Sequence, residues 1–260
     1  MKQDRKQIAL VTGASSGMGR CFVRKIAENY PFLHEIWVIA RREEALDALQ
    51  KELPETELKI LVCDLSERQS FQALGELLKQ ESPRIRLLVN GAGLGHNGPV
   101  ERQTPDGICS TVDVNCRALM VVTRICLPYL GRGSRVIQMA SGSAFLPQPG
   151  FAVYAASKAC VLSFSRALRE ELRHKKISVT AVCPGPVRTD FFRAGGISIS
   201  PVKKMFLAEP EKVVERALED AARGKAVSVY GISMKLVRLA AAVLPEGLLI
   251  WLSGKLFRNV

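Results

Sequence analysis

A tyrosine and a lysine four positions apart are the first residues whose types suggest chemistry. They are Tyr154 and Lys158, the ends of the stretch YAASK at 154–158. Positions i and i+4 lie on one face of a helix. A phenol has an ordinary pKa of about 10, and a nearby cation lowers it toward the range in which acid–base catalysis works best. The pair predicts a proton-exchanging site, although such a pair alone is more often a surface or packing feature.

A glycine-rich loop follows the first apolar run of the chain. The sequence TGASSGMG at 12–19 joins the predicted strand 7–12 to a helical pattern over 18–29. Glycines let a pyrophosphate approach the backbone amides at a helix N-terminus, where the helix dipole favours anions. A tight turn alone also requires glycine, but the place between strand and helix predicts dinucleotide binding. The predicted contact residues are Gly13, Ser15, Ser16, Gly17, Met18 and Gly19.

The end of the second predicted strand indicates which dinucleotide would bind. NAD sites usually carry an acidic residue there, which holds the ribose 2′-hydroxyl. Here strand 35–40 is followed by Arg41 and Arg42, and the first acid is Glu43. Guanidinium groups match phosphate geometry, so we predict NADP(H) in preference to NAD(H), with a further charge from Arg20. The alternative is that the two arginines only begin a solvated helix.

These residues must be positioned by alternating short strands and helices. Strands are predicted at 7–12, 35–40, 60–62, 87–89, 136–139 and 177–182. Helices are predicted at 18–29, between strand 35–40 and residue 53, and at 66–80, 106–130, 154–174 and 210–223. Short strands that are apolar on both faces and alternate with helices are typical of a parallel sheet covered on both sides. No repeat or linker divides the chain, so we predict one domain over 1–260, with a substrate loop at 190–210 that closes over the substrate.

Composition excludes several classes of protein. The chain has 260 residues, 47% of them hydrophobic, and carries a net charge of +12. Basic and acidic residues are interspersed, which argues against nucleic-acid binding. The N-terminus shows no signal-peptide pattern, and the seven cysteines show no CxxC pair, so we expect a cytoplasmic protein with reduced thiols. The three histidines, His34, His96 and His174, lie in unrelated segments, and we predict no metal site.

Further motifs make the sequence similar to a known family. They are Cys63-Asp64-Leu65, Asn90-Gly91-Ala92-Gly93, Asn115, Ser141, and Pro184-Gly185-Pro186-Val187-Arg188-Thr189, in addition to the glycine loop and YAASK. In this order and spacing they resemble the short-chain dehydrogenase/reductase family, in its branch of about 250 residues. The resemblance covers residues 7–190. Ser143 competes with Ser141, but its distance from Tyr154 is two residues shorter than the family pattern.

The resemblance implies a catalytic role for four residues. Tyr154 would be the general acid/base, and Lys158 would lower its pKa and bind the nicotinamide ribose. Ser141 would hydrogen-bond and polarise the substrate carbonyl. Asn115 would distort its helix and hold a water that links Lys158 to solvent; without the other motifs it could simply be an amide bonded to backbone.

The resemblance also implies the remaining cofactor contacts. Asp64 would contact the adenine, Asn90 the region of the adenine ribose, and Thr189 with the Val187 backbone the nicotinamide and pyrophosphate. Leu65, Ala92, Pro184 and Gly185, with Tyr154 and Lys158, complete the predicted set. The implied fold is a doubly wound Rossmann-like sheet of about seven parallel strands. The implied assembly is a homodimer or homotetramer packed through 106–130 and 154–174.

Apolar residues are predicted around the reacting carbonyl. They are Phe145, Leu146, Pro147, Phe151, Pro186, Phe191, Phe192, Met205 and Phe206. They indicate a small hydrophobic ketone or alcohol, such as a steroid, a bile-acid-like compound or a fatty 3-oxoacyl compound. Plain packing of the fold is the equal alternative. The predicted activity is NADP(H)-dependent interconversion of a ketone and a secondary alcohol, and the alternative is a non-catalytic NADP(H)-sensing regulator on the same scaffold.

The C-terminal extension, 232–260, is apolar and basic. Pro245, Glu246 and Gly247 divide it into two pieces that are too short to span a bilayer. The basic residues are Lys235, Arg238, Lys255 and Arg258, and the extension also contains Trp251. Three interpretations remain open: contact with a membrane surface, packing against a partner subunit, or a roof over the substrate pocket. A further alternative is a peripheral membrane protein whose extension is its main functional element.

Overall fold

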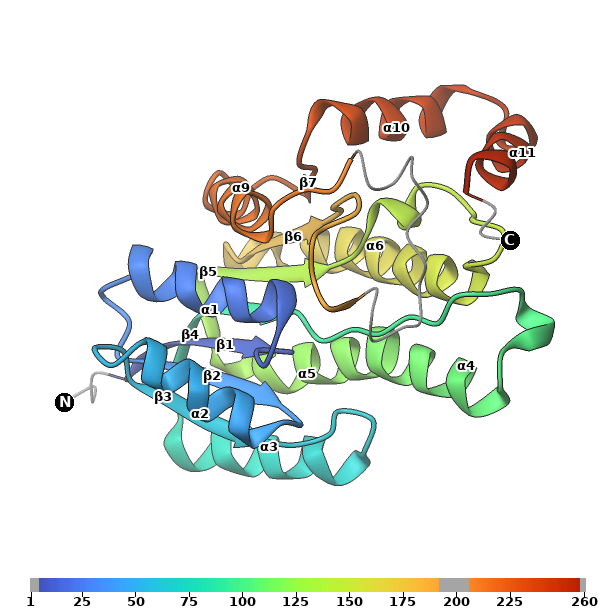
Figure 1. Cartoon of the computed structure of the whole chain (residues 1–260). Helices are drawn as coiled ribbons and strands as arrows, with labels where there is room; N and C mark the ends of the chain where they lie inside the picture. The colour runs from blue at the N-terminus through green and yellow to red at the C-terminus, as the bar shows by residue number, and fades with distance from the viewer. Residues whose placement is uncertain (1–4, 192–205, 258–260) are drawn as a thin grey trace.

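Seven parallel strands form one sheet in the order β3-β2-β1-β4-β5-β6-β7 (Figure 1). The computed structural model describes residues 5–191 and 206–257. The strands are β1 (Gln7–Thr12), β2 (Glu35–Ala40), β3 (Leu58–Val62), β4 (Arg84–Asn90), β5 (Leu130–Met139), β6 (Ser178–Val182) and β7 (Val227–Ser228). The predicted α/β fold with about seven parallel strands is confirmed.

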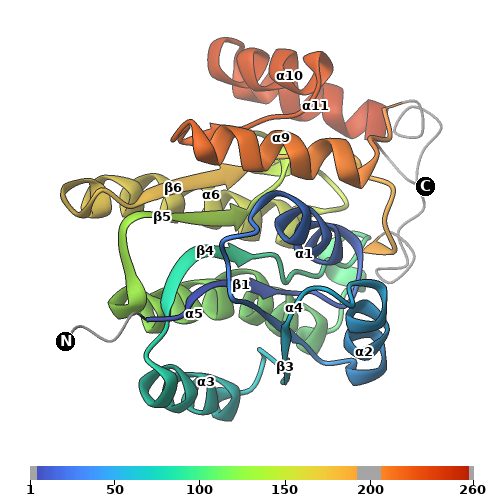
Figure 2. The same cartoon turned by 90° about the vertical axis from the view of Figure 1, so that its left-hand side faces the viewer.

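Helices cover both faces of the sheet (Figure 2). One face carries α1 (Gly17–Asn29), α2 (Glu43–Glu52) and α9 (Pro210–Ala222), and the other carries α3 (Arg68–Glu81), α4 (Pro105–Val112), α5 (Leu119–Cys126) and α6 (Ala152–Leu172). Two more helices, α10 (Ile232–Val243) and α11 (Glu246–Phe257), form an outer layer beyond β6 and β7. None of the described helices is long and apolar enough to cross a membrane.

Each face of the sheet has its own hydrophobic core. On the first face the fully buried side chains include Phe22, Ile26, Leu46, Leu49 and Val214. On the second face they include Leu78, Ile85, Val122, Val136 and Val179. Burial of a side chain of this size contributes about 1.5–3 kcal/mol, so the two cores fix the strands whose carboxyl ends carry the loops of the site.

Three elements differ from the sequence-based prediction. The helix predicted over 106–130 is divided by a π-helical turn over Asp113–Ala118, and a 3-10 turn over Leu127–Tyr129 ends it. Strand β5 begins six residues earlier than predicted, because the polar segment at its start still pairs with β4 around an irregularity in register. Most of the predicted substrate loop 190–210 lies outside the described residues, including Phe192 and Met205.

Candidate active site

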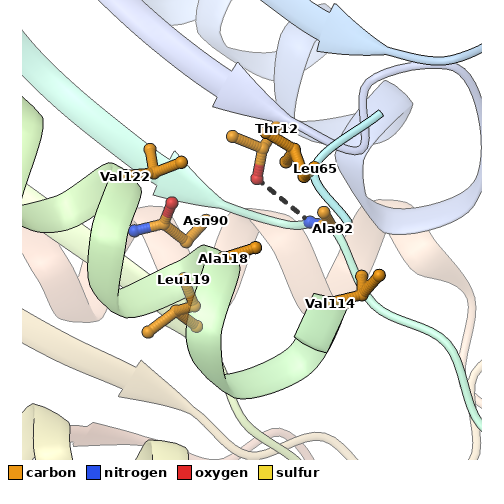
Figure 3. A pocket seen from close by; sticks show the side chains of 8 residues that line it. All are labelled: Thr12, Leu65, Asn90, Ala92, Val114, Ala118, Leu119 and Val122. Carbon is orange, nitrogen blue, oxygen red and sulfur yellow. Dashed lines mark hydrogen bonds between the residues drawn. The ribbon is translucent and has the colours of Figure 1, made fainter. Parts of the chain in front are cut away.

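The glycine loop after β1 and the loop after β4 contact each other closely. The backbone amide of Ala92 donates a hydrogen bond to Thr12 Oγ1 over 3.1 Å (Figure 3). Gly13 has a φ of +72°, and a Cβ on it would lie 2.7 Å from the Ala92 backbone. Glycine is therefore required at position 13 on two grounds, its backbone conformation and its neighbour.

The N-terminus of α1 fits an anionic group. Ser16 precedes the helix but gives it no side-chain cap, and its first turn contains no acidic residue. Its first amides therefore lack the side-chain acceptor that most helices supply there. Gly17 has a φ of +53°, and a Cβ on it would lie 3.3 Å from Thr189 Cβ. The structure thus brings Thr189 to the glycine loop, and the cradle has the chemistry to hold a pyrophosphate.

Two arginines stand at the end of β2. The Arg42 guanidinium donates to Ser15 Oγ over 3.2 Å, and Arg41 lies 3.6 Å from an oxygen of Asp64. Burial would raise the pKa of Asp64, but hydrogen bonds from Ser66 and the charge of Arg41 hold it below its ordinary value. Both arginines are exposed beside the cradle. A 2′-phosphate would meet positive charge there.

Arg20 is paired with an acid beside this positive cluster. Its guanidinium binds Glu52, which also binds Arg24. One carboxylate is therefore shared by two arginines, and the further charge from Arg20 for the cofactor stays a prediction.

A narrow crevice too small to hold a water molecule lies between the loops after β1, β3 and β4 and helix α5 (Figure 3). Its lining includes the predicted cofactor residues Leu65, Asn90 and Ala92. The Asn90 side chain, however, is only 2% exposed and its amide donates to Thr123 and Gln138, both at 2.9 Å. Asn90 therefore positions the loop by bonding within the core, and its place in the region of the adenine ribose stays a prediction.

The Ser141 hydroxyl lies beside the Tyr154 side chain and lowers the pKa of the phenol. Ser141 also accepts from the Ser143 amide over 3.1 Å, at the 3-10 turn that follows β5. The competing Ser143 hydroxyl instead donates to Gln148 over 3.2 Å. The structure therefore pairs Ser141, and not Ser143, with the tyrosine.

Aromatic side chains enclose the phenol ring. Phe151 stacks on Tyr154 with ring centroids 4.4 Å apart, and Phe191 lies at 5.3 Å in a tilted arrangement. A Cβ on Gly95 would lie 2.7 Å from Tyr154 Cδ2, so the loop after β4 also packs on the ring. Burial raises the pKa of Tyr154 to about 12, while the neighbouring Ser141 hydroxyl acts in the opposite direction. The phenol is therefore protonated and poised to donate.

Lys158 and Asn115 converge behind the same loop. A Cβ on Gly93 would lie 3.3 Å from both Asn115 Oδ1 and Lys158 Nζ. Asn115 lies in the π-helical turn, is fully buried, and exchanges two hydrogen bonds with the Leu94 backbone at 2.8 and 2.9 Å. Its amide also donates to Ser157 over 2.9 Å. The helix distortion implied by the family resemblance is present at this residue.

The ammonium of Lys158 is held by a backbone carbonyl near the phenol ring. It donates to the Met139 carbonyl oxygen over 2.8 Å and lies 5.6 Å from the centroid of the phenol ring. Burial lowers the pKa of Lys158 to about 8. Burial is the largest influence on the pKa of both groups, and the role of the lysine in lowering the phenol pKa stays a prediction.

The predicted segment 184–189 lies partly under the C-terminal extension. The Pro184 carbonyl accepts from the Gly142 amide over 2.7 Å, and a Cβ on Gly185 would lie 2.8 Å from Met234 Cγ. Val187 is buried and pairs with Ala208 in an isolated bridge. Met234 of α10 therefore holds together the loop that follows β6 and the turn that carries Ser141.

Part of the apolar segment predicted around the carbonyl is covered from outside. The centroid of the Phe145 ring lies 5.9 Å from the Arg238 guanidinium, and the Pro147 carbonyl accepts a hydrogen bond from Ser253. A Cβ on Gly254 would lie 3.6 Å from Pro149 Cγ, so these two residues also pack together. Thus α10 and α11 pack over 144–149, and Phe151 and Phe191 are the predicted apolar residues that contact Tyr154.

Sequence reasoning missed Gly95, Ser157 and Met234. The glycines of the loop, GAGLG at 91–95, were a visible signal of close backbone approach. Ser157 lies inside YAASK, and nothing in its type shows that it bonds Asn115. Met234 carries no local signal, because its contacts are with Gly142 and Gly185, residues 92 and 49 positions earlier.

A parallel sheet with a dinucleotide cradle beside a serine–tyrosine pair defines the protein as a dinucleotide-binding oxidoreductase. A family model described as short chain dehydrogenase matches residues 7–196. The chain belongs to the short-chain dehydrogenase/reductase family, whose members are nicotinamide-dependent oxidoreductases acting on CH–OH groups. Members of the family generally form homodimers or homotetramers.

Known proteins of the family are similar over most of this chain. Sulfoacetaldehyde reductase 2 of Chromohalobacter salexigens is 34% identical over 197 residues, which are 73% of this chain and 77% of that one. The NADP-dependent 3-hydroxy acid dehydrogenase YdfG of Salmonella typhimurium is 33% identical, over 79% of each chain. A short-chain dehydrogenase from Sphingobium yanoikuyae, solved with NADPH, superposes with a TM-score of 0.78 at 28% identity, over 91% of this chain and 92% of that one.

Proposed function

We propose that this protein is an NADP(H)-preferring enzyme that interconverts a ketone and a secondary alcohol on a hydrophobic substrate. The observation that carries the proposal is the placement of the buried Ser141, Tyr154 and Lys158 at one site, where the Ser141 hydroxyl lowers the pKa of the phenol. The nicotinamide would supply or accept the hydride when bound. Its phosphates would lie at Gly13–Gly19 and its ribose near Lys158, as expected from the matching positions of the family.

The residues of the site have separate roles in ketone reduction. Ser141 holds the substrate carbonyl oxygen beside the phenol. Tyr154 gives its hydroxyl proton to that oxygen, which becomes the alcohol, and it regains a proton from solvent through Lys158 and Asn115. In the oxidative direction the same proton returns to Tyr154. The intact set favours the enzyme over the alternative of a non-catalytic NADP(H)-sensing regulator.

The substrate class is proposed from the aromatic walls of the site. Phe151 and Phe191 lie against Tyr154, which favours a hydrophobic ketone of the steroid, bile-acid-like or fatty 3-oxoacyl kind. The names of two relatives, a sulfoacetaldehyde reductase and a 3-hydroxy acid dehydrogenase, point instead to small anionic carbonyl compounds. Both classes therefore belong in the test.

The assembly is proposed to form through α5 and α6. The outward face of α6 consists of small residues, among them Ala152, Ala156, Ala159 and Ser163, which allow a second helix to approach closely. Val112, at the end of α4, is 46% exposed near the same side of the chain. A homodimer or homotetramer packed there follows the family pattern.

The test of the proposal follows NADPH and NADH oxidation at the nicotinamide absorbance band against a panel of both substrate classes. Tyr154→Phe is the matched variant, because it removes only the phenol oxygen. We expect turnover with a hydrophobic ketone, faster with NADPH, and a loss of about 10²–10⁴-fold in the variant. NADPH binding with no turnover on any member of the panel, together with an unchanged Tyr154→Phe phenotype in cells, would favour the regulator.

A further inference from the structure

The outer face of α10 is an apolar ridge that no described residue covers. It consists of Ile232, Leu236, Leu239 and Val243, which are 77%, 59%, 60% and 72% exposed. Their spacing of four, three and four residues places them in one stripe along the helix. Soluble proteins rarely leave such a continuous stripe exposed without an interaction partner.

The ridge continues onto α11. Leu244 and Leu248 are 44% and 45% exposed, and Trp251 and Leu252 follow on the same outward face of α11. The opposite face is anchored: Ser253 is buried and donates to the carbonyls of Ile250 and Pro147. Both helices are therefore held by their inner faces, and no residue in the described part of the chain covers their apolar outer faces.

Cations border the ridge. Lys235 and Arg238 of α10, with Arg166 of α6, line a cavity of about 600 Å³ whose other walls are apolar. None of these three forms an ion pair with a carboxylate in the described part of the chain. On α11, Lys255 Nζ lies 4.1 Å from the centroid of the Trp251 ring. Glu246 is the one acidic residue in the sequence from 232 to 257.

We propose that α10 and α11 dock the protein on the anionic surface of a lipid bilayer. The ridge would enter the boundary between headgroups and acyl chains, and Trp251 would lie at the headgroup level. Lys235, Arg238 and Lys255 would contact the headgroup phosphates, and each contact would strengthen binding to an anionic surface. The two helices have 12 residues each, so they lie in the interface and do not span it.

The charges favour a membrane over a second copy of the chain. A two-fold contact brings the same surface of both copies together. Pairing through the ridge would place Lys235 and Arg238 near their own counterparts, with Glu246 as the only acid of these helices to compensate. An anionic bilayer instead offers acyl chains to the apolar ridge and phosphate groups to the cations that border it. The docking proposal is independent of the reaction that the enzyme catalyses.

Vesicle flotation of the full chain tests the proposal. The probes are vesicles of phosphatidylcholine and the same vesicles with added phosphatidylglycerol. We expect flotation with the anionic vesicles, weaker at high salt, and little with the neutral ones. Leu236→Gln/Val243→Gln should lower the bound fraction about tenfold, and Lys235→Gln/Lys255→Gln about tenfold on the anionic vesicles. Phe32→Gln, which removes exposed apolar surface between α1 and β2, should leave binding unchanged.

Tryptophan fluorescence locates the contact. The chain has two tryptophans; Trp37 is fully buried and Trp251 is 55% exposed. Brominated phosphatidylglycerol should quench Trp251, and the quenching should disappear in Trp251→Phe. Absence of flotation, or flotation that the ridge variants do not change, would overturn the proposal. A dimer that dissociates in Leu236→Gln/Val243→Gln, with no vesicle binding, would assign the ridge to a second copy instead.

Discussion

The α-carbon of Gly95 faces the ring of Tyr154 so closely that a Cβ would lie 2.7 Å from Tyr154 Cδ2. It would also lie 3.0 Å from Phe191 Cζ and 3.3 Å from Phe151 Cζ. The loop after β4 therefore fixes the position of the phenol. Gly95 takes no part in proton transfer, but it determines where the phenol that donates the proton lies.

Gly95→Ala should lower kcat/KM by about 10- to 100-fold. The added methyl group displaces the tyrosine ring at an overpacking cost of about 1–3 kcal/mol, and each 1.4 kcal/mol on the barrier is about tenfold in rate. Steady-state kinetics measure the effect. Gly247→Ala is the control, since a Cβ there meets no atom within 4 Å. Equal rates for both variants would show that the loop does not position Tyr154.

Ser141→Ala should lower kcat far more than Ser143→Ala does. The Ser141 hydroxyl lies beside Tyr154, so its loss should reduce kcat about 10²–10³-fold, as for the removal of one donor to a developing oxyanion. Ser143 bonds only Gln148 and the Ser141 hydroxyl, and its hydroxyl contributes about 1 kcal/mol to stability at most. Kinetics of the two variants on the same ketone provide the comparison. A larger loss in Ser143→Ala would reverse the assignment.

Arg41→Asp should shift the cofactor preference from NADPH toward NADH. Reversal of the charge beside the cradle removes a charge-assisted bond, worth about 1.5–3 kcal/mol, to the 2′-phosphate. The ratio of kcat/KM values for the two cofactors should change by about 10- to 100-fold. Arg132→Asp is the control, because that residue is exposed at the other end of the sheet. An unchanged ratio would remove Arg41 from the cofactor site.

The titration of Lys158 should change how the free energy of unfolding depends on pH. Burial lowers the pKa of Lys158 to about 8, from 10.5 in an unfolded chain. Between these values the unfolded state binds more protons, so wild type gains stability as the pH rises, by up to about 1.4 kcal/mol per pH unit. Lys158→Met lacks this gain. Thermal unfolding of wild type and Lys158→Met at pH 7 to 10, without cofactor, measures the difference in stability. An equal dependence of stability on pH in the two proteins would contradict the lowered pKa of Lys158.

Asp220 should stabilise the attachment of β7. Burial would raise its pKa, but bonds from Lys225, Ser228 and Arg216 hold it below the ordinary value of 3.8. The stabilisation is complete above pH 3.8 and is lost as the pH falls through the lower, folded value. Asp220→Asn should cost about 1–3 kcal/mol at neutral pH, since both cations are partly exposed. Denaturant unfolding should show that wild type and Asp220→Asn differ less in stability in acid than at neutral pH. A difference that stays constant with pH would contradict the prediction.

The fold was predictable because its signals are local. Strands 7–12 and 35–40 are short apolar runs, and the buried β1 and β2 have those bounds. Segments whose pattern is mixed were less predictable. The first residues of β5, which include Gly131 and Arg132, look like a loop but still pair with β4.

The site was predictable in its residue types and less so in its contacts. Tyr154, Ser141 and Asn115 occupy the expected positions, because motif spacing specifies them. Two side chains make contacts that the sequence does not reveal, for one physical reason. The Asn90 side chain bonds within the core, and the Lys158 ammonium bonds the Met139 carbonyl. A sequence names the residue at a strand end, but burial decides which way the side chain turns and how it titrates.

The order of the strands constrains how the nascent chain can assemble. Strand β1 lies between β2 and β4, and Ala9 pairs with Leu87, 78 positions later. During synthesis the glycine loop therefore cannot meet its partner at Ala92 until four strands have left the ribosome. Contacts so distant in sequence are slow to form, and until β4 arrives one edge of β1 is open to wrong partners. The contact between the glycine loop and Ala92 can form before Tyr154 has been translated, whereas Thr189, which also lies at that loop, joins it only later.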